Sequence, residues 1–188
     1  MLVVDLFSGT GAATQAFADR GHKVIRIDNN PKLKPDIVAD VCFLPLKDLK
    51  PDFVWASPPC QDFSNVCHRN WTRQREGGWP AEGFETYLAA CDAIAILNPP
   101  YWAIENVRGA ARWWGKPTKR VGRSTCKANA PFLLWGRFPP FDANTPFKGF
   151  VRFNKTSPAH HTPPAATSAS IPYALSLALC MALERDLA

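Results

Sequence analysis

Short apolar runs recur along the chain, and segments of helical composition lie between several of them. The runs have the length of buried strands and cover residues 2–7, 23–28, 36–40, 53–57 and 101–105. The helical segments cover residues 12–20, 84–97 and the strongly apolar 171–187. Strands that alternate with helices build parallel sheets, so the pattern predicts an α/β fold with a doubly wound, mostly parallel sheet. Right-handed crossovers would then bring the carboxyl ends of these strands to one edge of the sheet.

Two polar segments lack this periodicity. Residues 61–80 form a long loop with several arginines and glycines directly after the fourth strand. A loop of this length next to reactive side chains is typical of a lid. Residues 155–170 are rich in Pro, Thr, Ala and His, which predicts an extended connection to the final helix.

The composition fits one globular domain spanning residues 1–188, with 46% hydrophobic and 20% charged residues. No apolar run has the length of a bilayer span and no signal-like segment opens the chain. We therefore expect no membrane partner, and a cytoplasmic location in a prokaryote or a virus-infected cell. The six cysteines form no CxxC pair, which argues against a zinc ribbon or a disulfide framework. Cys67-His68 lacks a second spaced pair, so we expect no metal.

Positive charge is concentrated in residues 106–155. This segment contains eleven Lys or Arg and a single acid, Asp142, whereas the whole chain has a net charge of +6. The aromatic residues interleaved with these charges are Trp113, Trp114, Phe132, Trp135 and Phe138. Basic residues mixed with aromatic ones are typical of a nucleic-acid face. An ordinary solvated basic surface has the same composition and is the alternative.

A glycine-containing turn follows the first strand, and an acid ends each of the next two strands. Phe7-Ser8-Gly9-Thr10-Gly11 would let a ligand approach the backbone closely. Asp28 can hold ribose hydroxyls, and Asp40 can accept a hydrogen bond from an adenine amino group. The third glycine of a dinucleotide fingerprint is missing, because position 14 is Thr. An adenosine-containing cofactor without a pyrophosphate fits this pattern, and S-adenosylmethionine is the candidate.

Cys60 follows the fourth strand on a turn that two prolines restrict. A thiol at the carboxyl edge of a parallel sheet lies where α/β enzymes place their chemistry. A buried structural cysteine is the alternative reading of this position.

Taken in order, these motifs resemble those of the DNA cytosine-C5 methyltransferases. Asp5–Gly11 is similar to the first motif of that family, Pro58-Pro59-Cys60-Gln61 with Phe63-Ser64 to its nucleophile motif, and Glu105-Asn106-Val107 to its Glu-Asn-Val. The resemblance covers residues 1–109. It implies that Cys60 adds to C6 of a cytosine flipped out of the duplex, while Glu105 hydrogen-bonds or protonates N3.

The resemblance also implies which residues bind the cofactor and the nucleic acid. The expected cofactor contacts are Phe7, Ser8, Gly9, Thr10, Gly11, Asp28, Asn29, Asp40, Val41, Pro59 and Ser170. The expected nucleic-acid contacts are Gln61, Ser64, Arg69, Arg73, Arg75, Asn106, Arg108, Arg112, Lys119, Arg120 and Arg123. The implied partner is double-stranded DNA in preference to RNA, with a protein partner as a possible source of specificity.

The chain departs from the family pattern in its second half. Residues 127–131 are the counterpart of the family's Gln-x-Arg-x-Arg motif, and both arginines are absent. Ala169-Ser170-Ile171-Pro172 stands where the family usually has Gly-Asn-Ser-Val-Pro. Residues 108–167 are far fewer than the usual target-recognition domain, which predicts a reduced recognition segment that reads few base pairs. Two alternatives stay open: the same reaction on tRNA or another single strand, and a non-catalytic homologue that only binds nucleic acid.

Asn98-Pro99-Pro100-Tyr101 spells the catalytic motif of amino-methyltransferases that act on adenine N6 or cytosine N4. That chemistry needs the motif after the fourth strand. Here it precedes the fifth strand, at the opposite edge of the sheet. We therefore interpret it as a helix-to-strand turn, because Pro-Pro ends helices.

Overall fold

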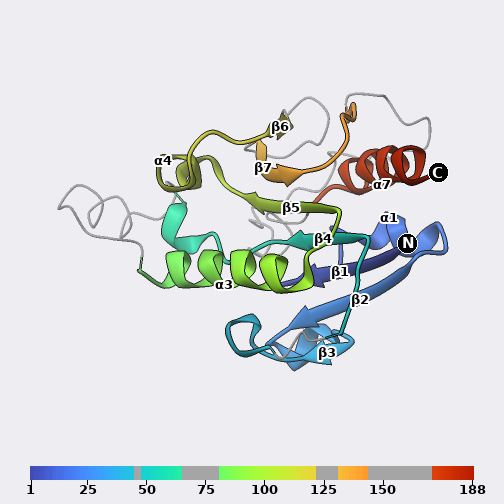
Figure 1. Cartoon of the computed structure of the whole chain (residues 1–188). Helices are drawn as coiled ribbons and strands as arrows, with labels where there is room; N and C mark the ends of the chain where they lie inside the picture. Colours follow the sequence, from blue (N-terminus) through green and yellow to red (C-terminus); the bar gives the residue numbers. More distant parts are fainter. Residues whose placement is uncertain (45–47, 65–80, 122–130, 144–170) are drawn as a thin grey trace, which may run out of the picture.

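The computed structural model describes residues 1–44, 48–64, 81–121, 131–143 and 171–188, and these build one sheet with helices on both faces (Figure 1). Its seven strands run in the order β3-β2-β1-β4-β5-β7-β6. They are β1 (Leu2–Leu6), β2 (Lys23–Asp28), β3 (Ile37–Val38), β4 (Phe53–Ala56), β5 (Tyr101–Asn106), β6 (Lys119–Val121) and β7 (Phe132–Arg137). The first five pair in parallel, and β7 runs antiparallel between β5 and β6. The predicted doubly wound, mostly parallel sheet is confirmed.

The central strands are buried on both faces, which explains their continuous apolar runs. All four residues of β4 are fully buried. At the edge of the sheet, both residues of β3 are exposed, and the strand is only two residues long. The sequence predicted a longer third strand over residues 36–40. Asp36 and Asp40 instead bond backbone N–H groups outside the ladder, those of Arg26 and Cys42 respectively.

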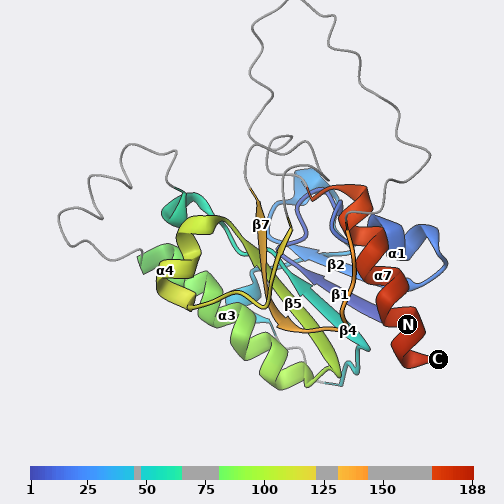
Figure 2. The same ribbon diagram turned by 90° about the horizontal axis from the view of Figure 1, so that it is seen from above.

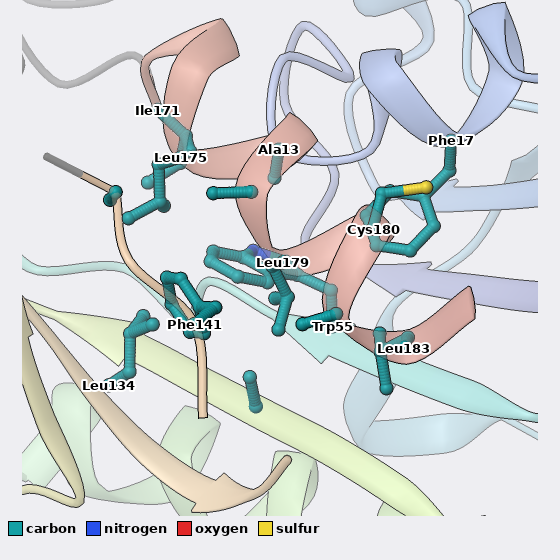
Figure 3. Close-up of a cluster of buried hydrophobic side chains, with 14 of the residues drawn as sticks. Ala13, Phe17, Trp55, Leu134, Phe141, Ile171, Leu175, Leu179, Cys180 and Leu183 are labelled. Atoms are coloured by element: carbon teal, nitrogen blue, oxygen red, sulfur yellow. The ribbon is translucent and has the colours of Figure 1, made fainter. Parts of the chain in front are cut away.

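Helices α1 (Gln15–Asp19) and α7 (Tyr173–Leu187) cover one face, and α3 (Ala81–Leu97) covers the other (Figure 2). The alternation of side chains along β4 divides the core accordingly. Phe53 and Trp55 pack with α7, where Leu179 and Leu183 lie close to Trp55 (Figure 3). Val54 and Ala56 pack with α3 on the opposite face.

Two helices begin later than the sequence predicted. Residues 12–14 form a turn, and α1 begins only at Gln15. The side-chain hydroxyl of Thr14 donates a hydrogen bond to Asp5 Oδ2 at 2.6 Å, which ties this turn to β1. The final helix begins at Tyr173, since Pro172 has the extended backbone of an N-cap residue. No helix in the described ranges combines the length and apolarity needed to cross a membrane.

Part of the predicted recognition segment, residues 108–167, belongs to the sheet. A 3-10 turn η4 (Arg108–Ala110) and the short helix α4 (Ala111–Trp114) follow β5, and both β6 and β7 lie within the segment. Phe132 and Trp135 of β7 are buried in the hydrophobic core. These two aromatic side chains of the basic segment therefore offer no surface on which a nucleic-acid base could stack.

The Asn98-Pro99-Pro100-Tyr101 segment lies where we predicted, between the end of α3 at Leu97 and the start of β5 at Tyr101. Asn98 has a left-handed backbone with φ +42, and its N–H bonds the Ile94 carbonyl at 2.8 Å. The segment is thus a helix-to-strand turn at the amino end of β5.

Candidate active site

The loop after β1 is held against the carboxyl end of β2. Asp28 Oδ2 accepts a hydrogen bond from the Gly9 N–H at 2.8 Å, and its Oδ1 accepts one from the Asn30 N–H at 2.9 Å. Gly9 has a φ of +53, which glycine adopts at little cost. Because a carboxylate can accept about four hydrogen bonds, Asp28 keeps capacity for a ligand while it fixes the turn.

Asp40 occupies the equivalent position after β3. Its Oδ1 accepts a hydrogen bond from the Cys42 N–H at 2.9 Å and caps the 3-10 turn η2 (Val41–Phe43). This turn directs Val41 inward, where it is 6% exposed, and leaves Phe43 84% exposed. The carboxylate of Asp40 thus lies beside the apolar side chains of Val41 and Phe43.

A pocket of about 800 Å³ opens along these strand ends. Six of the predicted cofactor residues line it: Phe7, Asp28, Asn29, Asp40, Val41 and Pro59. The pocket lining does not include Ser8, Gly9, Thr10 or Gly11, and Ser170 lies outside the described residues. The pocket is also lined by residues that the sequence pattern did not predict: Phe43 and an α3 wall formed by Glu85, Leu88, Ala89 and Asp92. The spacing of those four helical residues places them on one face, which was the available signal.

The residues that line the pocket fit a nucleoside. Two carboxylates lie at neighbouring strand ends beside apolar walls, as a nucleoside requires. Behind the turn, Ser8 Oγ and Asp5 Oδ1 are buried and make no hydrogen bond within the described part of the chain. Buried polar atoms normally have partners, and because neither residue lines the pocket, a buried water is the partner open to these atoms.

Cys60 follows β4, and Glu105 lies near the carboxyl end of the adjacent strand β5. β4 and β5 pair in parallel with Ala56 opposite Ile104, so the next residues, Ser57 and Glu105, are neighbours on one face. The turn carrying Cys60 is tied to β5 by Asn106, whose Nδ2 donates to the Pro58 carbonyl at 3.0 Å.

The environment of these two side chains changes their acidity. Burial raises the pKa of the Glu105 carboxyl from 4.5 to about 8, and a hydrogen bond with Ser57 opposes the rise. Burial also raises the pKa of the Cys60 thiol, and the charge of Glu105 adds to that rise. A neutral Glu105 would therefore remove one obstacle to forming the Cys60 thiolate. The pair provides a carboxylic acid that can donate a proton next to a latent nucleophile.

Asn106 was predicted to contact nucleic acid, but the structure places its side chain inside the protein. It is completely buried, and its Oδ1 accepts from the Val107 N–H while its Nδ2 bonds Pro58. Lys119 is also committed within the fold, because its Nζ donates to the Phe141 carbonyl at 2.6 Å and lies 4.5 Å from the centre of the Phe141 ring.

The remaining predicted nucleic-acid residues divide into two groups. Arg108, Arg112, Arg120 and Gln61 are exposed, and Ser64 is partly buried. Arg108 lies on the 3-10 turn η4 and Arg112 on the short helix α4, and both elements follow the carboxyl end of β5. The predicted contacts Arg69, Arg73, Arg75 and Arg123 lie outside the described residues, as does most of the predicted lid.

The sheet order and the paired strand-end motifs define an α/β protein of the methyltransferase type. The family model for C-5 cytosine-specific DNA methylase matches residues 1–113, and the chain belongs to that family. A "Probable DNA (cytosine-5)-methyltransferase" from Frog virus 3 (isolate Goorha) is 35% identical over 120 residues, covering 56% of this chain and 53% of the viral protein.

A solved structure shares the fold. The methyltransferase EhMeth of Entamoeba histolytica matches with a TM-score of 0.54 and 17% sequence identity, over 81% of this chain and 55% of that one. The chain therefore spans about half the length of the relatives it matches.

Proposed function

We propose that this protein transfers a methyl group from S-adenosylmethionine to C5 of cytosine in double-stranded DNA. The observation that carries the proposal is the pairing of Cys60 with Glu105, one from each of two adjacent strand ends and electrostatically coupled. Membership of the C-5 cytosine-specific family supports the choice of base and atom. The pocket beside Pro59 supports the location of the methyl donor, since it shares a wall with the Cys60 turn.

In this proposal the two side chains activate the base together. The Cys60 thiolate forms a bond to C6 while Glu105 gives its proton to N3, so the C5–C6 double bond becomes an electron-rich enamine at C5. S-adenosylmethionine, when bound, supplies an electrophilic methyl group. Loss of the C5 proton to a base then re-forms the double bond and expels Cys60. The proton on N3 returns to Glu105, which leaves both side chains as they began.

The cofactor would be held by the carboxylates at the ends of β2 and β3. Asp28 is placed to accept from ribose hydroxyls, and Asp40 from an adenine amino group. Phe7 and Val41 would contact the adenine ring, because both side chains line the same pocket. The target base must leave the duplex to reach Cys60, and the exposed Arg108 and Arg112 beside that edge would hold the backbone.

The test is transfer of a labelled methyl group to duplex DNA, to tRNA and to a sample without nucleic acid. We expect incorporation into duplex DNA at cytosine C5. Incorporation into tRNA alone would show that the substrate is RNA and not DNA. Incorporation into neither nucleic acid would favour a non-catalytic binding protein.

A Cys60→Ser variant is the matched control, since it changes one atom of the proposed nucleophile. We expect it to lose methyl transfer and to form no covalent adduct with 5-fluorocytosine DNA, while cofactor binding is retained. Turnover equal to that of the wild type in Cys60→Ser would remove the nucleophile assignment.

A further inference from the structure

A hydrogen-bonded chain lies behind Glu105 that the proposed chemistry does not use. Trp55 Nε1 donates to Ser57 Oγ at 2.7 Å. Ser57 in turn shares a hydrogen bond with the Glu105 carboxyl. The sheet register explains the arrangement, because Trp55 and Ser57 lie on one face of β4 and Glu105 continues the same face of β5.

The far side of Glu105 is apolar. In the antiparallel pairing of β5 with β7, Glu105 lies directly opposite Leu134, which is fully buried. Trp55 is also fully buried and packs in the same cluster as Leu134 (Figure 3). Ser57 is therefore the polar neighbour that the sheet provides to Glu105 on this face, and Leu134 is the apolar one.

The direction of the Trp55–Ser57 hydrogen bond follows from the chemistry of the two groups. An indole N–H only donates, so Ser57 Oγ must be the acceptor in its bond with Trp55. The hydroxyl proton of Ser57 is then available to Glu105. With that proton directed to Glu105, the carboxyl oxygen that faces Ser57 is an acceptor, and a neutral Glu105 carries its own proton on the other oxygen.

We propose that Trp55 and Ser57 are positioning residues that determine which Glu105 oxygen carries the proton offered to the target base. The assignment deepens the proposed methyl transfer and rests on it. An acid that held its proton toward Ser57 would have to rotate before it could donate to N3. The Trp55–Ser57 pair removes that need, because the acceptor side of the carboxyl is already engaged.

The direction of the Ser57–Glu105 hydrogen bond determines whether the Glu105 pKa rises or falls when the Ser57 hydroxyl is removed. If Ser57 donates to Glu105, it stabilises the carboxylate, and its removal must raise the Glu105 pKa further. If Ser57 instead accepted the acid proton, its removal would lower that pKa. A donated hydrogen bond to a charged group corresponds to about one pH unit.

The experiment is a carboxyl-carbon NMR titration of the full chain without cofactor or DNA. We expect Glu105 to titrate near pH 8 in the wild type and about one pH unit higher in Ser57→Ala. Ser57→Thr keeps the hydroxyl and should restore the wild-type value. Ser176→Ala is the control for loss of a serine hydroxyl, because Ser176 is fully buried and accepts a hydrogen bond from the Ala16 N–H instead of contacting Glu105.

A second readout follows the indole of Trp55. Its Nε1–H resonance should shift as Glu105 titrates in the wild type, and this response should disappear in Ser57→Ala. The test uses Ser57 variants because Trp55→Phe alters a fully buried residue and could disturb folding. In methyl-transfer assays, the alkaline limb of the kcat profile should move upward with the Glu105 pKa.

An unchanged or lowered Glu105 pKa in Ser57→Ala would overturn the proposed orientation. The NMR titration needs no turnover, so it decides the role of Ser57 separately from the activity. A wild type without methyl transfer, but with the expected upward shift, would count against the proposed function and leave the hydrogen-bond direction established.

Discussion

Replacing Glu105 by Gln should stabilise the folded protein, and the gain should increase with pH. Burial raises the pKa of this carboxyl from 4.5 to about 8 in the folded state. In the unfolded chain the side chain loses its proton near pH 4.5. Between these two values the folded state binds the proton and the unfolded state does not, so the free energy of unfolding of the wild type falls as pH rises. A Gln side chain has no proton to lose and escapes this decrease.

The magnitude follows from the width of that pH window. It spans about three and a half pH units, and each unit corresponds to about 1.4 kcal/mol, which gives an upper limit of about 5 kcal/mol. Solvent still reaches part of the Glu105 side chain, which weakens the effect. We therefore expect Glu105→Gln to gain about 2–3 kcal/mol relative to the wild type between about pH 5 and about pH 9.

Urea unfolding of both proteins at several pH values measures this difference directly. Asp5, whose pKa burial raises to about 7, titrates in both proteins and cancels in the comparison. Glu85→Gln is the control, because Glu85 is an exposed carboxyl on α3. Parallel stability curves for the wild type and Glu105→Gln across this range would refute the claim that folding keeps Glu105 neutral. A Glu105→Gln variant that is more stable but no longer transfers methyl groups would show that Glu105 serves catalysis at a cost to the stability of the folded protein.

Two further predictions concern the ligands. Calorimetry should show S-adenosylmethionine binding weaker by about 1–3 kcal/mol in Asp28→Ala, because a charged acceptor and the anchor of the Gly9 N–H are both lost. Phe43→Ala should weaken binding less, since its ring lies at an exposed wall of the pocket, and unchanged affinity in both variants would move the cofactor elsewhere. Reversing the charge of the exposed Arg112 and Arg120 together should weaken duplex binding and reduce its salt slope by about one per lost phosphate contact, with cofactor affinity unchanged. A salt slope equal to that of the wild type would exclude both side chains from the DNA interface.

The sequence predicted the candidate site well where its residues follow buried parallel strands. Asp28, Asp40, Cys60 and Glu105 each come at or directly after an apolar run, and parallel strands bring such positions to one edge of a sheet. That inference needs no knowledge of distant contacts.

The predictions were weaker where structure depends on non-local pairing. β6 is three residues long and contains two basic residues, so its own pattern indicates a solvated surface, and it becomes a strand by pairing with β7. The aromatic residues of the same segment were counted toward a nucleic-acid face. β7 places Phe132 and Trp135 in the core instead, and composition cannot distinguish these environments. Phe43 was missed because a single exposed aromatic residue has no sequence pattern.

The acidity of Glu105 depends in part on a glycine outside the site. Leu134 dehydrates Glu105 because β7 pairs with β5 in a register that also sets Gly136 opposite Ala103. A side chain at Gly136 could not be accommodated, since its Cβ would lie 2.1 Å from the Trp102 carbonyl oxygen, and the glycine has a φ of +153. Any larger residue would therefore push β7 away from β5 and admit water beside the carboxyl. The antiparallel strand thus does more than complete the sheet: with Ser57 on the other side, it sets the environment in which Glu105 keeps its proton.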